Sequence, residues 1–286
     1  MSEPDKGKSV EQIRETALAG YADTCMRTRQ YCLLRPEEIL AEKERHSVIY
    51  LPVGPLEWHG PALPLGTDGI SAEKAAAAAA ERTGGVVLPT LWCGTFRSRD
   101  AADLAKQQFD DHTARIVGMD YPCATVKSFY AREEIFATVI REHLRLLVEH
   151  GYALIVIVTG HGGEGFYDVM ERLCDEASHD GDSRAVLLHA WADSAPPGEA
   201  GHATRIETSL MLALTDSVKL DTLPVEPEKL RYQDYGMLDD VYTDDGYVKF
   251  DPRTATADEG SAIFAAGVKN IIDVVNALLE KGRNNY

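Results

Sequence analysis

Four short apolar runs alternate with stretches of helical periodicity along this chain, and this alternation limits the folds that it can adopt. The runs are rich in Val, Ile and Leu, are bounded by turn residues, and span residues 47–53, 85–91, 153–159 and 185–190. Helical patterns occupy 36–44, 72–82, 132–150 and 165–177, and further helices are expected at 203–214 and 258–280. Strands that alternate with helices form a parallel sheet with helices on both faces. The sequence therefore predicts an α/β protein, a layered α/β/α structure around a mostly parallel central sheet.

The length of the chain suits one large core. With 286 residues we expect a single domain over residues 1–286, with an N-terminal extension at 1–45 whose residues 1–8 form a frayed tail. Two polar, irregular stretches, 95–122 and 223–255, interrupt the pattern. Excursions of this length in a compact domain usually cover an active site or mediate subunit contact, and plain surface insertions are the alternative.

Charge and cysteine usage narrow the class of protein. The 29 basic and 46 acidic side chains give a net charge of −17, and such a field repels phosphate backbones and anionic lipid surfaces. We therefore expect no nucleic-acid partner and no membrane partner. The five cysteines form no CxxC pair, which argues against a zinc knuckle and against a disulfide framework. The N-terminus is polar and has no apolar signal region, so a cytoplasmic location is predicted.

Three potential metal ligands, Glu57, His59 and Asp68, follow the first apolar run. That run ends near Val53, and ligands of open α/β sheets bind outside the carboxyl ends of the strands. If the segment around Glu57 is extended, Glu57 and His59 project from the same face. Asp68 comes just before the next predicted helix. Two carboxylates and an imidazole match the preferences of Zn, Mn and Fe; a turn-stabilising Asp and an exposed His are the alternative.

A second candidate, His161, stands between glycines directly after the third apolar run. Glycines on both sides of a histidine let the backbone come close to whatever that histidine contacts. A histidine at a junction between a strand and a helix indicates a functional site. The alternative is an anion-binding glycine loop, but the segment has neither the spacing of a P-loop nor its lysine.

A third cluster contains His202 and Glu207, the latter beside a stripe of apolar residues at four-residue spacing. A buried acid needs a partner, which a metal, Arg205 or a helix N-terminus would supply. Two residues five apart on a helix point about 140° away from each other. His202 and Glu207 can therefore converge only if His202 lies in the loop ahead of the helix, which the preceding Pro and Gly residues allow.

Taken together, these segments resemble the creatininase, or creatinine amidohydrolase, superfamily. The likeness lies in EWHGPALPLGTD (57–68), TGHGG (159–163) and GHATRIETS (201–209), which occur in the family's order. It covers about residues 47–215. The resemblance implies a creatininase-like layered α/β fold, a centre of two divalent metal ions (Zn, Mn or Fe), and assembly into trimers or hexamers.

Residue by residue, the resemblance implies that Asp68 is the ligand shared by both ions. Glu57 and His161 would bind one ion, and His59 the other.

Family members differ over which acid supplies the remaining ligand. Either the Glu of the ETS motif or an acid near the glycine-rich loop fills that place, so Glu207 is preferred and Glu164 is the reserve. His202 matches the family's catalytic histidine, and Glu207 is counted with it among the catalytic residues.

The expected activity is that of a metal-dependent hydrolase. Metal ions make hydroxide available at neutral pH and polarise carbonyl groups, so metal-bound hydroxide would attack a carbonyl of a small cyclic substrate, such as a cyclic amide or creatinine. His202 would move the proton to the leaving group. Trp58, Trp92 and Phe96 are candidates to line the pocket, with ordinary packing as the commoner alternative for each. Cys93 is expected to be an inert thiol rather than a nucleophile.

The substrate stays open. Ala62, Thr159 and Thr204 replace residues that are common in the family, which puts creatinine itself in doubt. Residues 117–130 resemble a subgroup connected with inositol breakdown, so ring opening of an oxidised cyclitol such as 3-dehydro-scyllo-inosose, by cleavage of a C–C bond, is an alternative. A metal-binding assembly protein without catalytic activity is another. A nucleotide-binding protein would need a phosphate cradle, which the sequence does not contain.

Overall fold

Four parallel strands form the central sheet of the computed structural model, which describes residues 28–110, 114–163, 165–179, 182–239 and 245–283. The strand order is β2-β1-β3-β4. The strands are β1 (Val48–Val53), β2 (Val86–Val87), β3 (Leu154–Thr159) and β4 (Arg184–His189). All four predicted strands are present, and the predicted parallel sheet is confirmed.

β2 is shorter than the predicted run of residues 85–91. Pro89 has no N–H group to donate to a neighbouring strand, so the ladder stops before it. Contact with β1 resumes at Leu91, whose backbone N–H donates to the carbonyl of Pro52 at 2.9 Å.

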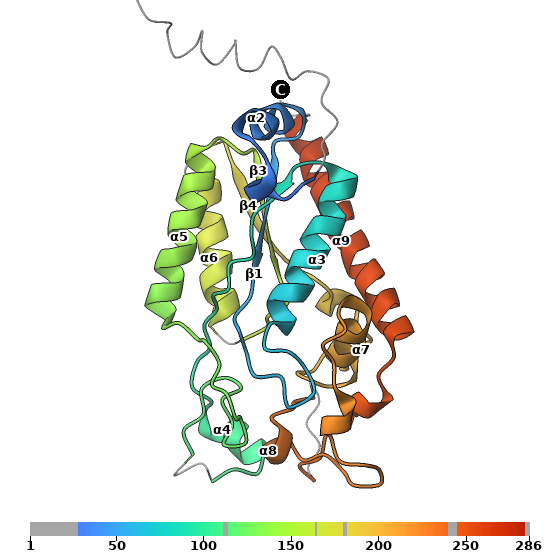
Figure 1. Ribbon diagram of the computed structural model, residues 1–286. Coiled ribbons are helices and arrows are strands. Elements are labelled where there is room, and N and C mark those ends of the chain that lie inside the picture. Colours follow the sequence, from blue (N-terminus) through green and yellow to red (C-terminus); the bar gives the residue numbers. More distant parts are fainter. Residues whose placement is uncertain (1–27, 111–113, 164, 180–181, 240–244, 284–286) are drawn as a thin grey trace, which may run out of the picture.

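Helices cover both faces of the sheet (Figure 1). One face carries α5 (Glu133–Glu149) and α6 (Phe166–His179), and the other carries α3 (Thr67–Thr83), α7 (Arg205–Leu214) and α9 (Ala257–Arg283). The shorter elements are α2 (Pro36–Arg45), α4 (Ala101–Lys106), α8 (Tyr232–Tyr235) and the 3-10 turns Tyr31–Leu33, Ala192–Ser194, Leu220–Thr222 and Pro252–Thr254. The predicted α/β/α layering is therefore confirmed.

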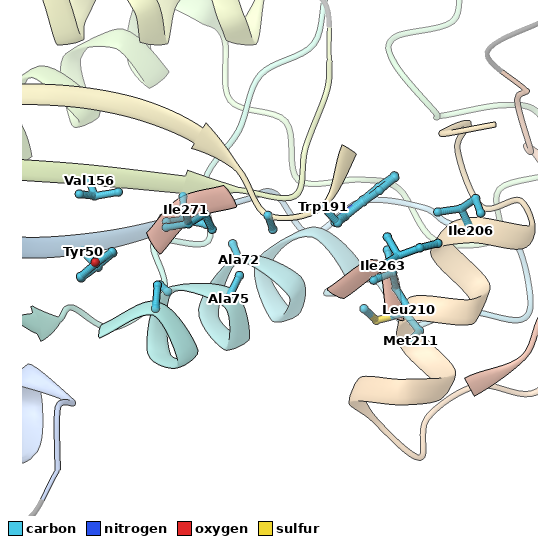
Figure 2. Close-up of a cluster of buried hydrophobic side chains, with 14 of the residues drawn as sticks. Tyr50, Ala72, Ala75, Val156, Trp191, Ile206, Leu210, Met211, Ile263 and Ile271 are labelled. Atoms are coloured by element: carbon cyan, nitrogen blue, oxygen red, sulfur yellow. The ribbon is translucent and has the colours of Figure 1, made fainter. Parts of the chain in front are cut away.

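The alternation of side chains along β1 and β3 decides which residues meet which helices. Ile49 and Ile155 belong to the core beneath α5 and α6, whereas Tyr50 and Val156 belong to the core shared with α3, α7 and α9 (Figure 2). Both faces of each strand are buried. This double burial explains why the strands read as continuous apolar runs rather than as an alternation of apolar and polar residues.

The alanine run of α3 allows that helix to lie close to its neighbours. Ala75, Ala76, Ala79 and Ala80 are fully buried between the sheet and α9. Small side chains let helix and sheet backbones approach each other, and alanine also has the highest helix propensity. This packing fixes the start of α3, which carries Asp68.

α9 meets the length and hydropathy criteria for a membrane span over Ala257–Lys281, with a mean hydropathy of 1.6, and 22% of that window is buried. The core helix of a soluble protein meets the same criteria. Ile263, Ile271 and Val275 of α9 are buried in the core with α3 and α7. One side of α9 therefore packs in the same layer as α3 and α7.

Two helix starts differ from the prediction. α7 begins at Arg205 rather than at residue 203, because Ala203 has a φ of 55°, which a right-handed helix cannot contain. α3 begins at Thr67 rather than at residue 72. Asp68 therefore lies in the first turn of the helix and not just before it, which corrects the sequence expectation.

The two irregular stretches pack together beyond the carboxyl ends of the strands, where α4 and α8 lie (Figure 1). Leu104, Met119 and Tyr121 of the first stretch form one buried cluster with Tyr232 and Leu238 of the second. The stretches thus form a shared wall over one end of the sheet. The predicted frayed tail at residues 1–8 and most of the N-terminal extension lie outside the described residues.

Candidate metal centre

The site lies at the point where the direction of strand addition changes. From β1 the chain continues to β2 on one side, whereas β3 pairs with β1 on the other. Ligands of open α/β sheets bind outside the carboxyl ends of strands at such a switch point. Glu57 and His59 follow β1, and His161 follows β3, so the topology brings these loops to the same edge.

A first group of ligand atoms comes from Glu57, Asp68 and His161, and these atoms lie within 4.8 Å of one another. His161 Nδ1 is 3.2 Å from Glu57 Oε2 and 3.2 Å from Asp68 Oδ2. All three side chains are buried. The structure thus brings together residues from two separate segments, 57–68 and 159–163.

A second group comes from His59, Asp68 and Glu207, again within 4.8 Å. His59 Nε2 is 3.3 Å from Asp68 Oδ1 and 3.6 Å from Glu207 Oε2. Asp68 belongs to both groups, and its two carboxylate oxygens face different histidines. These two groups have the form of two adjacent cation positions with one shared carboxylate; Glu57, His59 and His202 form a third group within 4.8 Å.

The glycines around His161 allow these close approaches. A Cβ on Gly160 would lie 2.6 Å from the backbone oxygen of Asp68, and one on Gly163 would lie 2.4 Å from His161 Nε2. The Thr159 hydroxyl accepts a hydrogen bond from the backbone N–H of His161 at 3.0 Å. The predicted reason for glycine therefore holds for Gly160 but not for Gly162, where a Cβ would meet only Tyr167 at 4.0 Å.

His202 lies in the loop ahead of α7, which is the condition under which it was expected to approach Glu207. Its Nε2 donates to the backbone oxygen of Trp58 at 2.8 Å, and its Nδ1 is 3.9 Å from Glu57 Oε2. The rings of His202 and His59 are 4.2 Å apart between centroids. In the neutral ring Nε2 therefore carries the proton, and Nδ1 is the basic nitrogen.

The second irregular stretch holds His202 in place. The backbone N–H of Leu238 donates to the carbonyl of His202 at 2.9 Å, in an isolated antiparallel bridge. Gly201, with a φ of 40°, makes this approach possible, because a Cβ there would lie 2.7 Å from the Leu238 oxygen.

The electrostatics of the cluster favour positive charge between the carboxylates. Burial lowers the pKa of His59, but Asp68, Glu207 and Glu57 outweigh this effect and raise the pKa to about 10. For His161, burial likewise lowers the pKa, and Glu57 and Asp68 raise it to about 10. Without a metal ion, protons on these two imidazoles supply the positive charge that the buried carboxylates need.

The pKa values of Asp68, Glu207 and His202 are shifted as well. Burial raises the pKa of Asp68, but His59 and His161 hold it well below its usual range. Burial raises the pKa of Glu207 to about 8. Burial and the charge of His59 hold the pKa of His202 well below its usual value, so His202 is neutral at physiological pH.

The residues fit divalent cations. Within the described residues, His59 Nε2 and Asp68 Oδ2 are buried and make no hydrogen bond, although each lies close to a group of opposite charge. Buried polar atoms without hydrogen bonds are costly, and a bound cation would satisfy both. The donor set of carboxylate oxygens and imidazole nitrogens is the one that Zn, Mn and Fe accept.

Of the two candidates for the last ligand, the structure places Glu207 in the second group. Its Oε2 also accepts a hydrogen bond from the backbone N–H of Ala203 at 2.6 Å. The reserve candidate, Glu164, lies outside the described residues.

The family model for creatininase, described as creatinine amidohydrolase, matches residues 33–275. The chain belongs to the creatininase family. It is 27% identical to the creatinine amidohydrolase of Pseudomonas putida over 248 residues, which is 80% of this chain and 88% of that protein. Members of this family are hydrolytic enzymes, and the expectation of an enzyme is confirmed.

Solved creatininase structures share the fold. A crystal structure of creatinine amidohydrolase is similar with a TM-score of 0.62 at 22% identity, over 88% of this chain and 98% of that one. A manganese form of creatininase gives a TM-score of 0.61 at 22% identity with the same coverage. A putative creatinine amidohydrolase from Bacteroides fragilis gives 0.59 at 20% identity, over 88% and 97% of the two chains. The creatininase-like fold is thereby confirmed.

Tyr130 is a residue of the candidate site that the sequence did not single out. Its hydroxyl donates to Glu57 Oε1 and accepts from the backbone N–H of Met119 at 3.1 Å. Burial and the charge of Glu57 raise the pKa of Tyr130 well above its usual value, so the phenol stays protonated and acts as a donor. The sequence did contain a signal for this residue, because Tyr130 is the last residue of the segment 117–130 that resembles the inositol-related subgroup.

A cavity of about 490 Å³ opens onto the candidate metal ligands. Phe96, Arg99 and Met119 of the first irregular stretch line it, as do Leu238 and Asp239 of the second. Both stretches thus take part in the wall of the site, which is one of the two roles expected of them.

The three aromatic candidates behave differently. Phe96 lines the cavity, as expected. Trp58 is buried and contributes its backbone oxygen to His202 rather than its ring to the cavity wall, and Trp92 lies against Gly69 with 43% of its surface exposed. For Trp58 and Trp92 the alternative of ordinary packing therefore holds. Burial raises the pKa of the Cys93 thiol, which packs against the sheet core and agrees with an inert role.

Proposed function

We propose that this protein is a two-metal hydrolase that opens the ring of a small substrate by adding water to a carbonyl carbon. The observation that carries the proposal is the position of Asp68 between two groups of buried ligands. Membership of the creatininase family supports it, and so do the manganese and Zn-Zn forms in which related creatininase structures were solved.

Glu57, Asp68 and His161 would hold one ion. His59 and Glu207 would hold the second, again with Asp68. Divalent ions bound there would polarise the substrate carbonyl and lower the pKa of water toward neutrality.

His202 would carry the proton between the attacking water and the leaving group. It is neutral, its Nδ1 is the basic nitrogen, and its bond to the Trp58 carbonyl fixes the ring orientation. A general base must have its free nitrogen near the reacting atoms. His202 lines the cavity beside Glu57 and Glu207, which supports this role.

Tyr130 would position Glu57. The phenol occupies Oε1, which leaves Oε2 turned toward His161. Partners of this kind orient metal ligands and tune their basicity.

For the substrate class we infer a cyclic amide as the first candidate. The supporting observation is the similarity to the Pseudomonas putida creatinine amidohydrolase over most of both chains. Ring opening of an oxidised cyclitol such as 3-dehydro-scyllo-inosose is the second. It is favoured by the segment 117–130, which reaches the site through Met119 and Tyr130.

The test combines elemental analysis with a substrate panel. The purified protein, before and after treatment with a chelator, is assayed on creatinine, other cyclic amides and a diketo-inositol. We expect two equivalents of Zn, Mn or Fe and turnover that chelation abolishes and metal restores. Metal without turnover on any carbonyl substrate would indicate the inactive assembly protein instead.

A homo-oligomer, trimeric or hexameric, is part of the proposal, as are a cytoplasmic location and the absence of nucleic-acid and membrane partners. Sedimentation equilibrium of the full chain measures the oligomeric state directly. A monomer at micromolar concentration would contradict the assembly expected from the family resemblance.

A further inference from the structure

Arg99 is the cationic side chain of the cavity wall, and it comes from the first irregular stretch rather than from a family motif. Its guanidinium donates from Nε to the backbone oxygen of Gly118 at 2.8 Å and from Nη2 to Met119 Sδ at 3.1 Å. The group also lies over the ring of Phe96, 5.3 Å from its centroid. These contacts hold the guanidinium in one orientation at the cavity that the metal ligands share.

No carboxylate pairs with Arg99 in the part of the chain that the structure describes. Arg97, two residues earlier, shows the usual arrangement, since it forms ion pairs with Glu133 and Asp168. In a chain with 46 acidic and 29 basic side chains, a half-buried arginine without an acidic partner is unexpected. Its Nη1 makes no hydrogen bond to a described residue, so part of the donor fork remains available to a ligand.

The charge of the cavity makes such a donor valuable to an anion. Glu57, Asp68 and Glu207 line the same space, and the whole chain carries a net charge of −17. An anionic substrate would be repelled from this cavity unless fixed positive charge lay on its path. Arginine presents planar, parallel donors that match carboxylate oxygens better than lysine does.

We propose that Arg99 binds an anionic oxygen group of the substrate, a carboxylate or an enolate, while the substrate carbonyl lies toward the metal ligands. This inference rests on the proposed function and narrows its substrate class to small rings that carry a negative charge. A cavity of about 490 Å³ has room for a ring with one such substituent. Arg99 is then a specificity-determining residue, because its contact is with a part of the substrate that does not react.

The experiment compares pairs of ring compounds that differ in charge. Dihydroorotate and dihydrouracil are the same cyclic amide with and without a carboxylate. Cyclohexane-1,3-dione ionises to an enolate at neutral pH, whereas cyclohexanone stays neutral, and this second pair distinguishes an enolate from a carboxylate. Binding of each probe to the metal-loaded full chain is measured by isothermal titration calorimetry, with the metal content of every sample determined in parallel.

The variants are Arg99→Gln, Arg99→Lys and, as a matched control, Arg97→Gln, which removes one positive charge from the same segment outside the cavity. We expect Arg99→Gln to weaken binding of at least one anionic probe by about 10- to 100-fold, because the variant loses a charge-assisted hydrogen bond to the probe. Binding of the neutral probes should change less than about twofold. Arg99→Lys should fall between Arg99→Gln and the unmodified protein, because it keeps the charge and loses the fork. Arg97→Gln should bind all probes as the unmodified protein does.

Three results would overturn the inference. The first is an unmodified protein that binds neither anionic probe more tightly than its neutral partner, or binds no probe. The second is equal weakening of charged and neutral probes in Arg99→Gln, and the third is the same loss in Arg97→Gln. A protein that holds no metal would contradict the proposed function instead. Metal content therefore distinguishes failure of the function from failure of the Arg99 assignment.

Discussion

His59 and Asp68 face each other across the centre of the site, with His59 Nε2 3.3 Å from Asp68 Oδ1 and both side chains buried. In the absence of metal, the carboxylates raise the pKa of His59 to about 10, so a proton takes the place of a cation. Metal binding requires the neutral imidazole, and protons and metal ions therefore compete for the same nitrogen. Either a proton on His59 or a metal ion can balance the negative charge of Asp68. Both forms of the cluster therefore depend on the Asp68 carboxylate.

Replacement of that carboxylate tests the two-metal arrangement. Asp68→Ala should abolish both metal occupancy and turnover, because water cannot replace a shared ligand without separating the ions. Metal content by elemental analysis is the primary measurement, since it needs no known substrate. Asp168→Ala removes the same charge from the exposed side of α6 and should leave metal content unchanged. Near-normal occupancy in Asp68→Ala would contradict the bridging role.

If His202 transfers protons and does not bind metal, its replacement should lower the reaction rate without changing the metal content. His202→Ala should keep its metal and lose about 10²- to 10⁴-fold in kcat, the usual cost of a lost general acid–base group. The measurement is kcat and metal stoichiometry on the same preparation. His150→Ala, at an exposed position beyond α5, is the control and should alter neither. If His202→Ala loses metal, His202 is a ligand and the assignment of roles is wrong.

The sequence predicted the layers and the position of the site because both depend on local patterns. The apolar runs around Ile49 and Ile155 identify strands, and the order of strands and helices determines which loops meet at the edge of the sheet. The helical repeat also predicted that His202 could share a site with Glu207 only from the loop ahead of α7, and His202 lies in that loop. These inferences need only periodicity and chain order.

Other features depend on contacts between irregular segments, which have no period. Tyr130 reaches Glu57 from the loop ahead of α5, and Arg99 lines the cavity from the stretch 95–122, which itself packs on the stretch 223–255. The left-handed conformation of Ala203, which delays α7, is likewise a consequence of its surroundings. The residue type at these positions does not predict which other residues the side chain will contact.

The hydrogen bond from Tyr130 to Glu57 should contribute to metal affinity. Tyr130→Phe keeps the ring and removes the donor, and we expect about 10- to 100-fold weaker metal binding, as for other partners of metal ligands. Competition with a chelator of known affinity measures the change. Tyr50→Phe removes a buried phenol that hydrogen bonds to Thr83, far from the site, and serves as the control. That variant should lose about 0.5–1.5 kcal/mol of stability and keep its metal affinity. Equal metal affinity in Tyr130→Phe and the unmodified protein would contradict this prediction. It would mean that contacts other than the Tyr130 hydrogen bond orient Glu57.

Glu42, buried on α2 at the opposite end of the sheet, should make stability depend on acid pH. Burial raises its pKa, but the backbone N–H of Gly85 and the charges of Arg29 and His46 outweigh this and hold it below the usual 4.5. Glu42 Oε1 accepts from Gly85 at 2.8 Å and from Arg29 Nη1 at 2.7 Å. Since the folded pKa lies below the unfolded one, the stabilisation is fully present above pH 4.5 and disappears as the pH falls through the folded pKa.

Glu42→Gln removes this charge and keeps the shape. We expect a loss of about 1–2 kcal/mol in the free energy of unfolding at neutral pH. The gap between variant and unmodified protein should close as the pH falls below 4.5, because the protonated acid then resembles the amide. Urea unfolding from pH 7 to pH 3 gives the difference at each pH, and titrations common to both proteins cancel in it. Glu44→Gln, on the exposed side of the same helix, should show a difference near zero throughout. A gap for Glu42→Gln that stays constant down to pH 3 would mean that its hydrogen bonds, rather than its charge, stabilise the junction between α2 and β2.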